Sequence, residues 1–169
     1  TTINSSPDKF CMDQGGTIEL SAIGGYGTTL HWYDDFPGGN EVGTGTPLTL
    51  PAPTVSTTFY AVWENSCGIS VDKNYQVIVY QVSAADMAIT GIDSPYCSDA
   101  ADDLLSGTPN YGYLNKVFSF TGLAAGFTDN GDGTGLLSPS NLPNGTFNLT
   151  YTVTKDNCTH TITEPISIL

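Results

Sequence analysis

Apolar and polar residues alternate along many short segments of the chain, which is the pattern of half-buried β-strands. In residues 17–22 an isoleucine and a leucine share one face, while a glutamate and a serine share the other. Residues 28–33 place Leu30 and Trp32 on one face, so Trp32 is predicted to lie in a hydrophobic core. No long apolar pattern of helical period occurs, and the chain is predicted to be all-β. Further strands are predicted at residues 41–42, 46–50, 57–67, 74–80, 87–92, 116–120, 136–137, 147–158 and 160–168.

Turn-forming residues separate these strands and leave two local alternatives. Residues 99–105 fit either a helical turn or a strand preceded by an acidic loop. The dipeptide Asn144-Gly145 predicts a hairpin before the strand that carries Tyr151.

The second half of the chain repeats features of the first. Tyr60 begins a Tyr-x-Val sequence that is followed by four residues and Cys67, and Tyr151 begins the same pattern before Cys158. The first half has about seven short strands, which is typical of an immunoglobulin-like sandwich. We therefore predict two tandem immunoglobulin-like β-sandwich modules, at residues 1–82 and 83–169, joined stiffly through residues 81–86.

The four cysteines follow the same duplication. Cys11 and Cys97 share the pattern aromatic-Cys-x-Asp and precede the first clear strand of their modules, and none of the cysteines forms a Cys-x-x-Cys cluster of the kind that binds zinc. We predict one disulfide within each module, Cys11–Cys67 and Cys97–Cys158, because other pairings would break the duplicated pattern. Each would constrain the unfolded chain by about 4 kcal/mol and implies an oxidising compartment.

The charge of the chain excludes some partners. Seventeen acidic residues face four basic ones, for a net charge of −13, which would repel nucleic acids and anionic membranes. No apolar run reaches the ~18 residues of a membrane helix, so no membrane insertion is expected. We interpret the sequence as an internal piece of a larger exported protein and expect the piece to be monomeric.

Two acidic loops offer carboxylates that could bind a cation. Asp129 and Asp132 lie in a glycine-rich loop that could contribute oxygen ligands to calcium, but the loop lacks the spacing and the closing glutamate of an EF-hand. A plain turn without a cofactor is the favoured interpretation, with calcium as the alternative. Asp34, Asp35 and Glu41 are interpreted as solvated loop carboxylates.

Catalysis is not expected. His31 and His160 fall in different modules, and neither has a serine or cysteine partner in a recognisable nucleophile motif. The aromatic residues of the first module are interpreted mainly as core, with an aromatic surface for sugar stacking as the alternative. These aromatic residues are Tyr26, Trp32, Tyr33 and Phe36.

The sequence also resembles a known group of proteins. Trp32-Tyr33, Thr57-Thr58-Phe59-Tyr60 and Asn65-Ser66-Cys67-Gly68 resemble the Ig-like or PKD-like repeats of large Bacteroidetes surface adhesins. The loop 129–135 and the strand around Tyr151 are similar to a sister repeat of the same proteins, which include gliding-motility adhesins of the SprB kind exported by the type IX system.

The resemblance implies a non-enzymatic stalk segment of a cell-surface adhesin, outside the cell. Its expected partners are neighbouring repeats of the same polypeptide and surface polysaccharide or glycan. The alternative is a carbohydrate-binding module or an accessory domain of a secreted glycosidase. The sequence assigns no ligand-binding residues.

Overall fold

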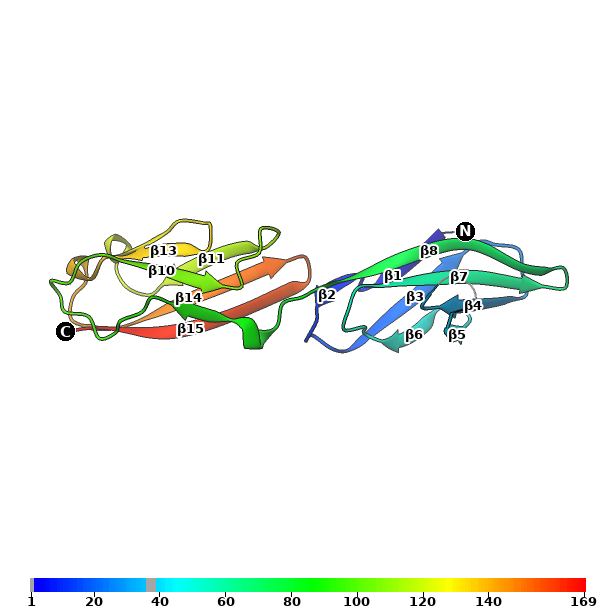
Figure 1. The fold of residues 1–169 in the computed structure, drawn as a ribbon, viewed down its shortest axis with the longest axis horizontal. Helices are drawn as coiled ribbons and strands as arrows, with labels where there is room; N and C mark the ends of the chain where they lie inside the picture. Colours follow the sequence, from blue (N-terminus) through cyan, green and yellow to red (C-terminus); the bar gives the residue numbers. More distant parts are fainter. Residues whose placement is uncertain (1, 36–38) are drawn as a thin grey trace. The chain divides into compact units, whose positions relative to one another are not determined.

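The computed structural model describes residues 2–35 and 39–169, with the backbone alone for residues 69–73. The chain divides into two compact units, Thr1–Gln81 and Val82–Leu169 (Figure 1). Within the described residues, no helix is long and apolar enough to cross a membrane.

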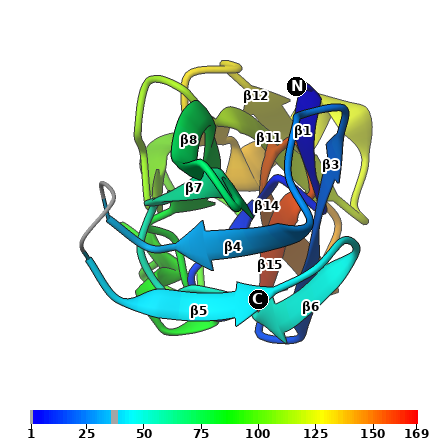
Figure 2. The same ribbon diagram turned by 90° about the vertical axis from the view of Figure 1, so that its right-hand side faces the viewer.

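The first unit is built from two sheets that pack face to face, and their strands pair antiparallel except for β2. One sheet has the order β1-β3-β6 and the other the order β2-β8-β7-β4-β5. The strands β4 and β5 lie side by side at one edge, with β6 following β5 (Figure 2). The strands are β1 Thr2–Ser6, β2 Lys9–Cys11, β3 Thr17–Ile23, β4 Thr29–Tyr33, β5 Glu41–Thr44, β6 Leu48–Pro51, β7 Thr57–Asn65 and β8 Gly68–Tyr80.

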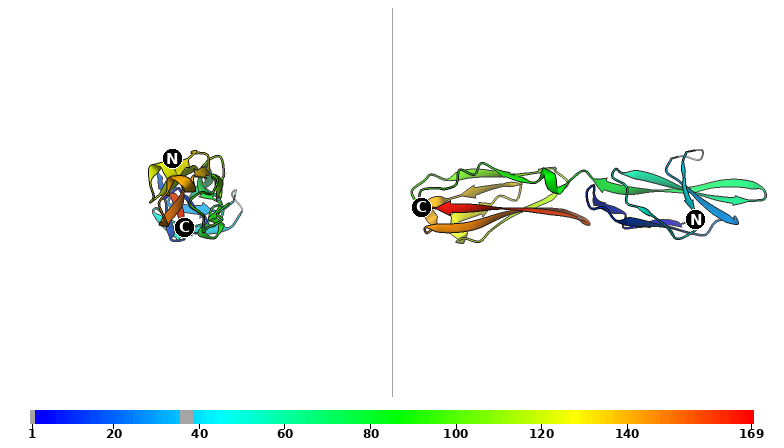
Figure 3. Two further views of the ribbon diagram at one scale, coloured as in Figure 1. Left: turned by 90° about the vertical axis from the view of Figure 1, so that its left-hand side faces the viewer. Right: turned by 90° about the horizontal axis from the view of Figure 1, so that it is seen from below.

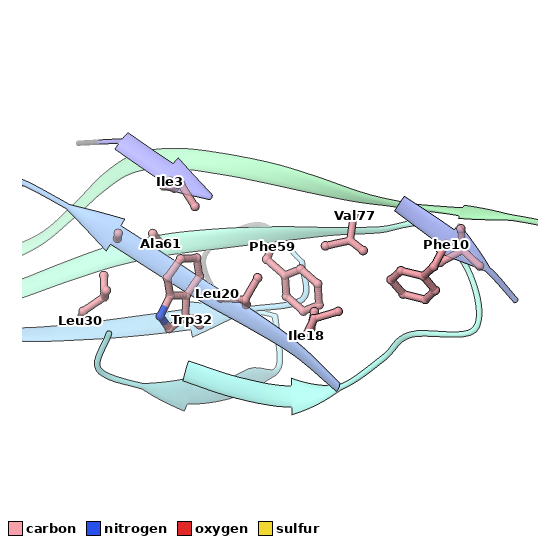
Figure 4. Packing of buried hydrophobic residues seen from close by; sticks show 11 residues of the cluster. Ile3, Phe10, Ile18, Leu20, Leu30, Trp32, Phe59, Ala61 and Val77 are labelled. Atoms are coloured by element: carbon pink, nitrogen blue, oxygen red, sulfur yellow. The ribbon is translucent and has the colours of Figure 1, made fainter. Parts of the chain in front are cut away.

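The core of the first unit lies between these two sheets. Trp32 on β4 is fully buried, as the alternation along that strand predicts, and its indole Nε1 donates a hydrogen bond to the Gly45 carbonyl at 2.8 Å. Side chains from both sheets surround it (Figure 4). Among the described residues, no polar or charged residue is fully buried. The other buried members of this cluster are Ile3, Phe10, Ile18, Leu20, Ala22, Leu30, Phe59, Ala61, Val77 and Val79.

The short strand β2 adds a parallel edge to the larger sheet. It pairs with the end of β8, so that Phe10 lies opposite Val79 and Cys11 opposite Tyr80. A segment near the start of the unit therefore runs beside its last strand, in the same direction. This pairing connects residues about seventy positions apart, and no local sequence pattern announces it.

The second unit is also a sandwich of two sheets, with the orders β12-β13-β10-β9 and β11-β14-β15. When the strands β9 to β15 are lettered A to G, the two sheets have the orders D-E-B-A and C-F-G. This is the arrangement of an immunoglobulin constant-type sandwich. The strands are β9 Ala88–Thr90, β10 Asp103–Thr108, β11 Asn115–Phe120, β12 Phe127–Asp129, β13 Thr134–Leu137, β14 Gly145–Lys155 and β15 Cys158–Ile168. Three 3-10 turns accompany them, η1 Ala84–Asp86, η2 Ala124–Gly126 and η3 Pro139–Asn141.

Tyr151 on β14 is the largest fully buried side chain of the second unit. Its ring packs against Phe118 at a centroid distance of 4.7 Å, and its hydroxyl donates to the Pro109 carbonyl at 3.0 Å. Leu149 and Val153 point the same way along β14 and are also fully buried. The predicted strand at 147–158 is therefore confirmed as a core strand up to Lys155, whereas Cys158 begins the next strand.

The structure tests the local predictions at residues 99–105 and at Asn144-Gly145. Residues 103–108 form the strand β10, so the helical-turn interpretation of 99–105 is wrong for that segment. The predicted hairpin at Asn144-Gly145 is also wrong. The strand β13 before it belongs to one sheet and β14 after it to the other, so the turn carries the chain across the sandwich. The last strand, β15, contains Pro165 and is the outer strand of its sheet, a position that tolerates a residue without a backbone N–H.

Candidate functional site

The two cysteines of the first unit lie at opposite ends of its last strand. Cys67 occupies the turn between β7 and β8, where its backbone N–H donates to Asn65 Oδ1 at 2.8 Å. Cys11 ends β2 and lies opposite Tyr80, the last residue of β8. Because β8 has 13 residues and a strand rises about 3.3 Å per residue, the two cysteines are separated by roughly 40 Å.

The second unit has the same arrangement. Cys158 opens β15 directly after the β14–β15 turn. Tyr96 forms a parallel bridge to Ile168 at the other end of β15, and the next residue is Cys97. The 11-residue length of β15 again separates the two cysteines by more than about 30 Å.

These positions correct the predicted disulfides. A disulfide requires its two Cα atoms to lie within about 7 Å, which neither unit allows for its own cysteines. Cys67 and Cys97 are free thiols and are exposed, whereas Cys11 and Cys158 are disulfide-bonded and buried. The predicted pairs Cys11–Cys67 and Cys97–Cys158 are therefore wrong. The statement that Cys11 precedes the first strand is also wrong, because β1 comes before it.

Strand register shows that each unit has an entry end and an exit end. In the first unit, Thr2 pairs with Ile23, and Thr29 pairs with Glu64 close to the turn that holds Cys67. The chain thus enters near this turn and leaves at Tyr80. We call the end with the β7–β8 turn the entry end, and the cysteine at this turn the hairpin cysteine. The end with Tyr80 is the exit end, and the cysteine there is the exit cysteine.

The second unit follows the same rule. Ala88 pairs with Thr108 at its entry end, and Asn115 pairs with Thr154 next to the turn before Cys158. Its last strand then runs to the exit end, where Tyr96 lies; Figure 3 shows the C-terminus and the β14–β15 turn at opposite ends of this unit. The hairpin cysteines are Cys67 and Cys158, and the exit cysteines are Cys11 and Cys97.

A buried tyrosine holds the exit segment of the second unit. The Tyr96 hydroxyl donates to Asp103 Oδ2 at 2.8 Å and accepts from the Asp93 N–H at 2.9 Å. Burial raises the pKa of Tyr96 to about 12, so the hydroxyl stays protonated and remains a donor. Backbone bonds from Tyr96 and Ser98 to Ser167 and Leu169 complete the attachment. No pattern in the sequence predicted this contact.

His31 bridges two carboxylates on the outer face of the first unit. Its Nδ1 lies 2.9 Å from Glu41 Oε1 and its Nε2 lies 3.0 Å from Glu64 Oε2, so one ring joins β5, β4 and β7. The hydrogen bond with Glu41, together with the second carboxylate, raises the pKa of His31 above its ordinary value. Glu41 is thus part of an ion-pair group and not only a solvated loop carboxylate.

This group predicts a pH dependence of the first unit. A protonated imidazole donates to both carboxylates, whereas the neutral ring donates to only one. Because the folded-state pKa is raised, the stabilisation is complete below the unfolded value near 6.5 and is lost as the pH rises through the folded value. We expect about 0.5–1 kcal/mol to be lost between pH 6 and pH 8.5, since the carboxylates are partly exposed.

Urea unfolding followed by tryptophan fluorescence would measure this loss, because both tryptophans lie in the first unit. The matched control is His31→Gln, which carries no titrating ring and should flatten the profile. An equal slope in wild type and His31→Gln would contradict the assignment to His31.

The loop with Asp129 and Asp132 is held by its own carboxylates. Asp129 accepts from the backbone N–H groups of Phe118 and Gly131, at 3.1 and 3.0 Å. Asp132 accepts from the backbone and the hydroxyl of Thr134, at 2.9 and 2.6 Å, and these bonds lower its pKa. Such bonds are typical of a structural turn. Calcium binding at Asp129 and Asp132 stays a prediction.

The aromatic residues of the first unit do not form one surface. Trp32 is buried in the core, Tyr33 is half-buried, and Tyr26 is 91% exposed. Phe36 lies outside the described residues. In the second unit, Tyr111 and Tyr113 stack with ring centroids 5.5 Å apart and are each almost half exposed. This pair was missed, although its i, i+2 spacing in a loop rich in Gly, Pro and Asn is a visible signal.

Several solved structures are similar to this chain at low sequence identity, and those with a TM-score of at least 0.50 share its fold. A chain in the crystal structure of a complex between the mouse coronavirus receptor-binding domain and its murine receptor aligns with a TM-score of 0.52 and 8% identity, over 99% of each chain. The I-band fragment I67–I69 from titin gives 0.50 and 11%, over 95% of this chain and 62% of that one. The fibronectin(III)-like modules of Clostridium thermocellum CbhA give 0.49 and 12%, over 99% and 93%.

The comparison with curated proteins gives no match. Residues 1–80 match a family model described as an Ig-like domain, CHU_C associated. That range coincides with the eight strands of the first unit, which is therefore an Ig-like module.

Proposed function

We propose that the chain is a non-enzymatic, extracellular stalk segment of a large bacterial surface adhesin. The observation that carries the proposal is that each unit receives the chain at one end and releases it at the other. Units of this kind extend a polypeptide when they are repeated, whereas entry and exit at one end would fold it back. The Ig-like match of residues 1–80 agrees with a repeated module.

The parallel pairing at each exit end suits a load-bearing role. In the first unit, Ile78 N–H donates to the Asp8 carbonyl and Met12 N–H to the Tyr80 carbonyl, at 2.8 and 3.0 Å. A pull on the two ends of the unit moves β2 and β8 past each other, so these bonds are loaded together and not one after another. The bonds around Tyr96 give the second unit a similar connection.

Single-molecule stretching of the chain between reference domains, under reducing conditions, would test this role. We expect two separate force peaks, each releasing at most about 30 nm of chain for units of this length. Met12→Pro removes one donor of the first clamp and should lower only the first unit's peak, so the second unit is the internal control. Extension of both units without force peaks would overturn the proposal.

A glycan-binding module is the second candidate, and the stacked pair Tyr111 and Tyr113 favours it. Two exposed aromatic faces of nearly parallel orientation offer an apolar surface with polar edges. Micromolar binding on a glycan array that is lost in Tyr111→Ala/Tyr113→Ala and retained in Tyr26→Ala would support this function. The stalk proposal expects no such binding.

A further inference from the structure

The two exit cysteines occupy equivalent places in their units. Cys11 lies opposite the last residue of β8, and Met12 donates to the Tyr80 carbonyl. Cys97 lies beside the end of β15, and Ser98 donates to the Leu169 carbonyl. Each exit cysteine is thus fixed by a parallel pairing at the end where the chain leaves its unit.

The two hairpin cysteines also correspond. Cys67 lies in the β7–β8 turn, and Cys158 comes directly after the β14–β15 turn. Both lie at the end where the chain enters their unit. Neither can reach the exit cysteine of its own unit, since the last strand separates them by about 30–40 Å.

Each of the two kinds contains one disulfide-bonded cysteine and one free thiol. The disulfide-bonded cysteines are one exit cysteine, Cys11 of the first unit, and one hairpin cysteine, Cys158 of the second. They are 2% and 0% exposed. The remaining exit cysteine, Cys97, and the remaining hairpin cysteine, Cys67, are free and exposed. Each free thiol therefore occupies the same position in its unit as a cysteine that is disulfide-bonded in the other unit.

We propose that Cys97 and Cys67 form disulfides with adjoining units of the same polypeptide. Cys97 pairs with the hairpin cysteine of a following unit, and Cys67 pairs with the exit cysteine of a preceding unit. The inference rests on the proposed stalk function, because it requires further units in line. Covalent bonds of this kind would join successive units in addition to the backbone, so that a stalk resists separation of its units.

The oxidation balances with a disulfide as the oxidant. The thiolate of one cysteine attacks an oxidised glutathione sulfur and releases one glutathione thiolate. The second cysteine then attacks the mixed disulfide, forms the protein S–S bond and releases the second glutathione. Two protein thiols are oxidised, two electrons pass to the glutathione disulfide, and the two protons are released to solvent or taken up by the glutathione thiolates.

A tandem of two copies of the chain would test the proposal. The two copies are joined by an inserted copy of residues 81–86. Eight residues then separate Leu169 of the first copy from Ile3 of the second, as eight residues separate Tyr80 from Ile89 within the chain. After oxidation with glutathione disulfide at high dilution, non-reducing peptide mapping should find Cys97 of the first copy bonded to Cys67 of the second. Alkylation should then detect two free thiols and not four.

Variants of the tandem distinguish the outcomes. Cys97→Ser in the first copy should leave Cys67 of the second copy free to alkylation, whereas Cys97→Ser in the second copy should leave the junction bond intact. Four alkylated thiols, a bond between Cys97 and Cys158 of one unit, or a bond that forms only as protein concentration rises would overturn the proposal. Peptide mapping does not depend on unfolding forces. The junction bond could therefore form although the stretching experiment contradicts the stalk function, and the stalk function could hold although no junction bond forms.

Discussion

Trp32→Ala is expected to destabilise the first unit by about 3–5 kcal/mol, the usual cost of truncating a large buried aromatic side chain. Trp32 has no exposed surface and lies in the middle of the core between the two sheets. Its removal also deprives the Gly45 carbonyl of the indole donor at 2.8 Å. A loss of this size approaches the whole stability of many domains of this length.

Tryptophan fluorescence can report the result because Trp63 on β7 remains as a probe in the same unit. Trp32→Phe is the matched control, since it keeps an aromatic ring in the core but lacks the N–H donor. It should cost clearly less than Trp32→Ala. A loss below about 1 kcal/mol for Trp32→Ala would show that Trp32 does not hold this core together.

Much of the first unit's fold could be predicted because alternation reports which face of a strand is buried. The segment at 17–22 and the strand that carries Trp32 were identified on that basis and lie where expected. The strand β2 could not be identified. It has only three residues, and its partner β8 is far away in sequence, so its stability comes from tertiary pairing and not from its own pattern.

The disulfide prediction failed because a repeated sequence does not give distances. The duplicated pattern identified Cys67 and Cys158 as equivalent, and both do lie at hairpin turns. The pattern did not show at which end of its unit each cysteine lies. The signal was partly available, since a cysteine in the turn before the last strand cannot meet a residue at the far end of that strand.

The polar groups of the candidate sites were predictable only in part. Asp129 and Asp132 were recognised as turn-forming from their position among glycines. The bridge from His31 to Glu41 and Glu64 was not, because these residues come from three strands whose register is set by the fold. Residues in one sheet become neighbours through pairing, and a single sequence does not specify that pairing.

Gly107→Ala is expected to destabilise the second unit by about 1–3 kcal/mol, through overpacking and not through backbone strain. Gly107 is buried on β10, and a Cβ at this position would lie 2.4 Å from the Tyr151 ring. The ring cannot move away easily, because its hydroxyl is bonded to the Pro109 carbonyl and its face packs against Phe118. Gly112→Ala is the matched control, since a Cβ there meets no atom within 4 Å and should be neutral or slightly stabilising.

A double-mutant cycle would assign this cost to the contact itself. Tyr151→Ala is strongly destabilising alone, but it removes the ring that a Cβ at residue 107 would strike. In that background Gly107→Ala should cost little, with a coupling energy of about 0.5–3 kcal/mol. Circular dichroism with simultaneous tryptophan fluorescence can follow the second unit, because both tryptophans report the first unit and the remaining dichroism change belongs to the second. Additive costs would mean that Gly107 acts through the backbone of β10, and the close packing of Gly107 against Tyr151 would then not be the reason for glycine at this position.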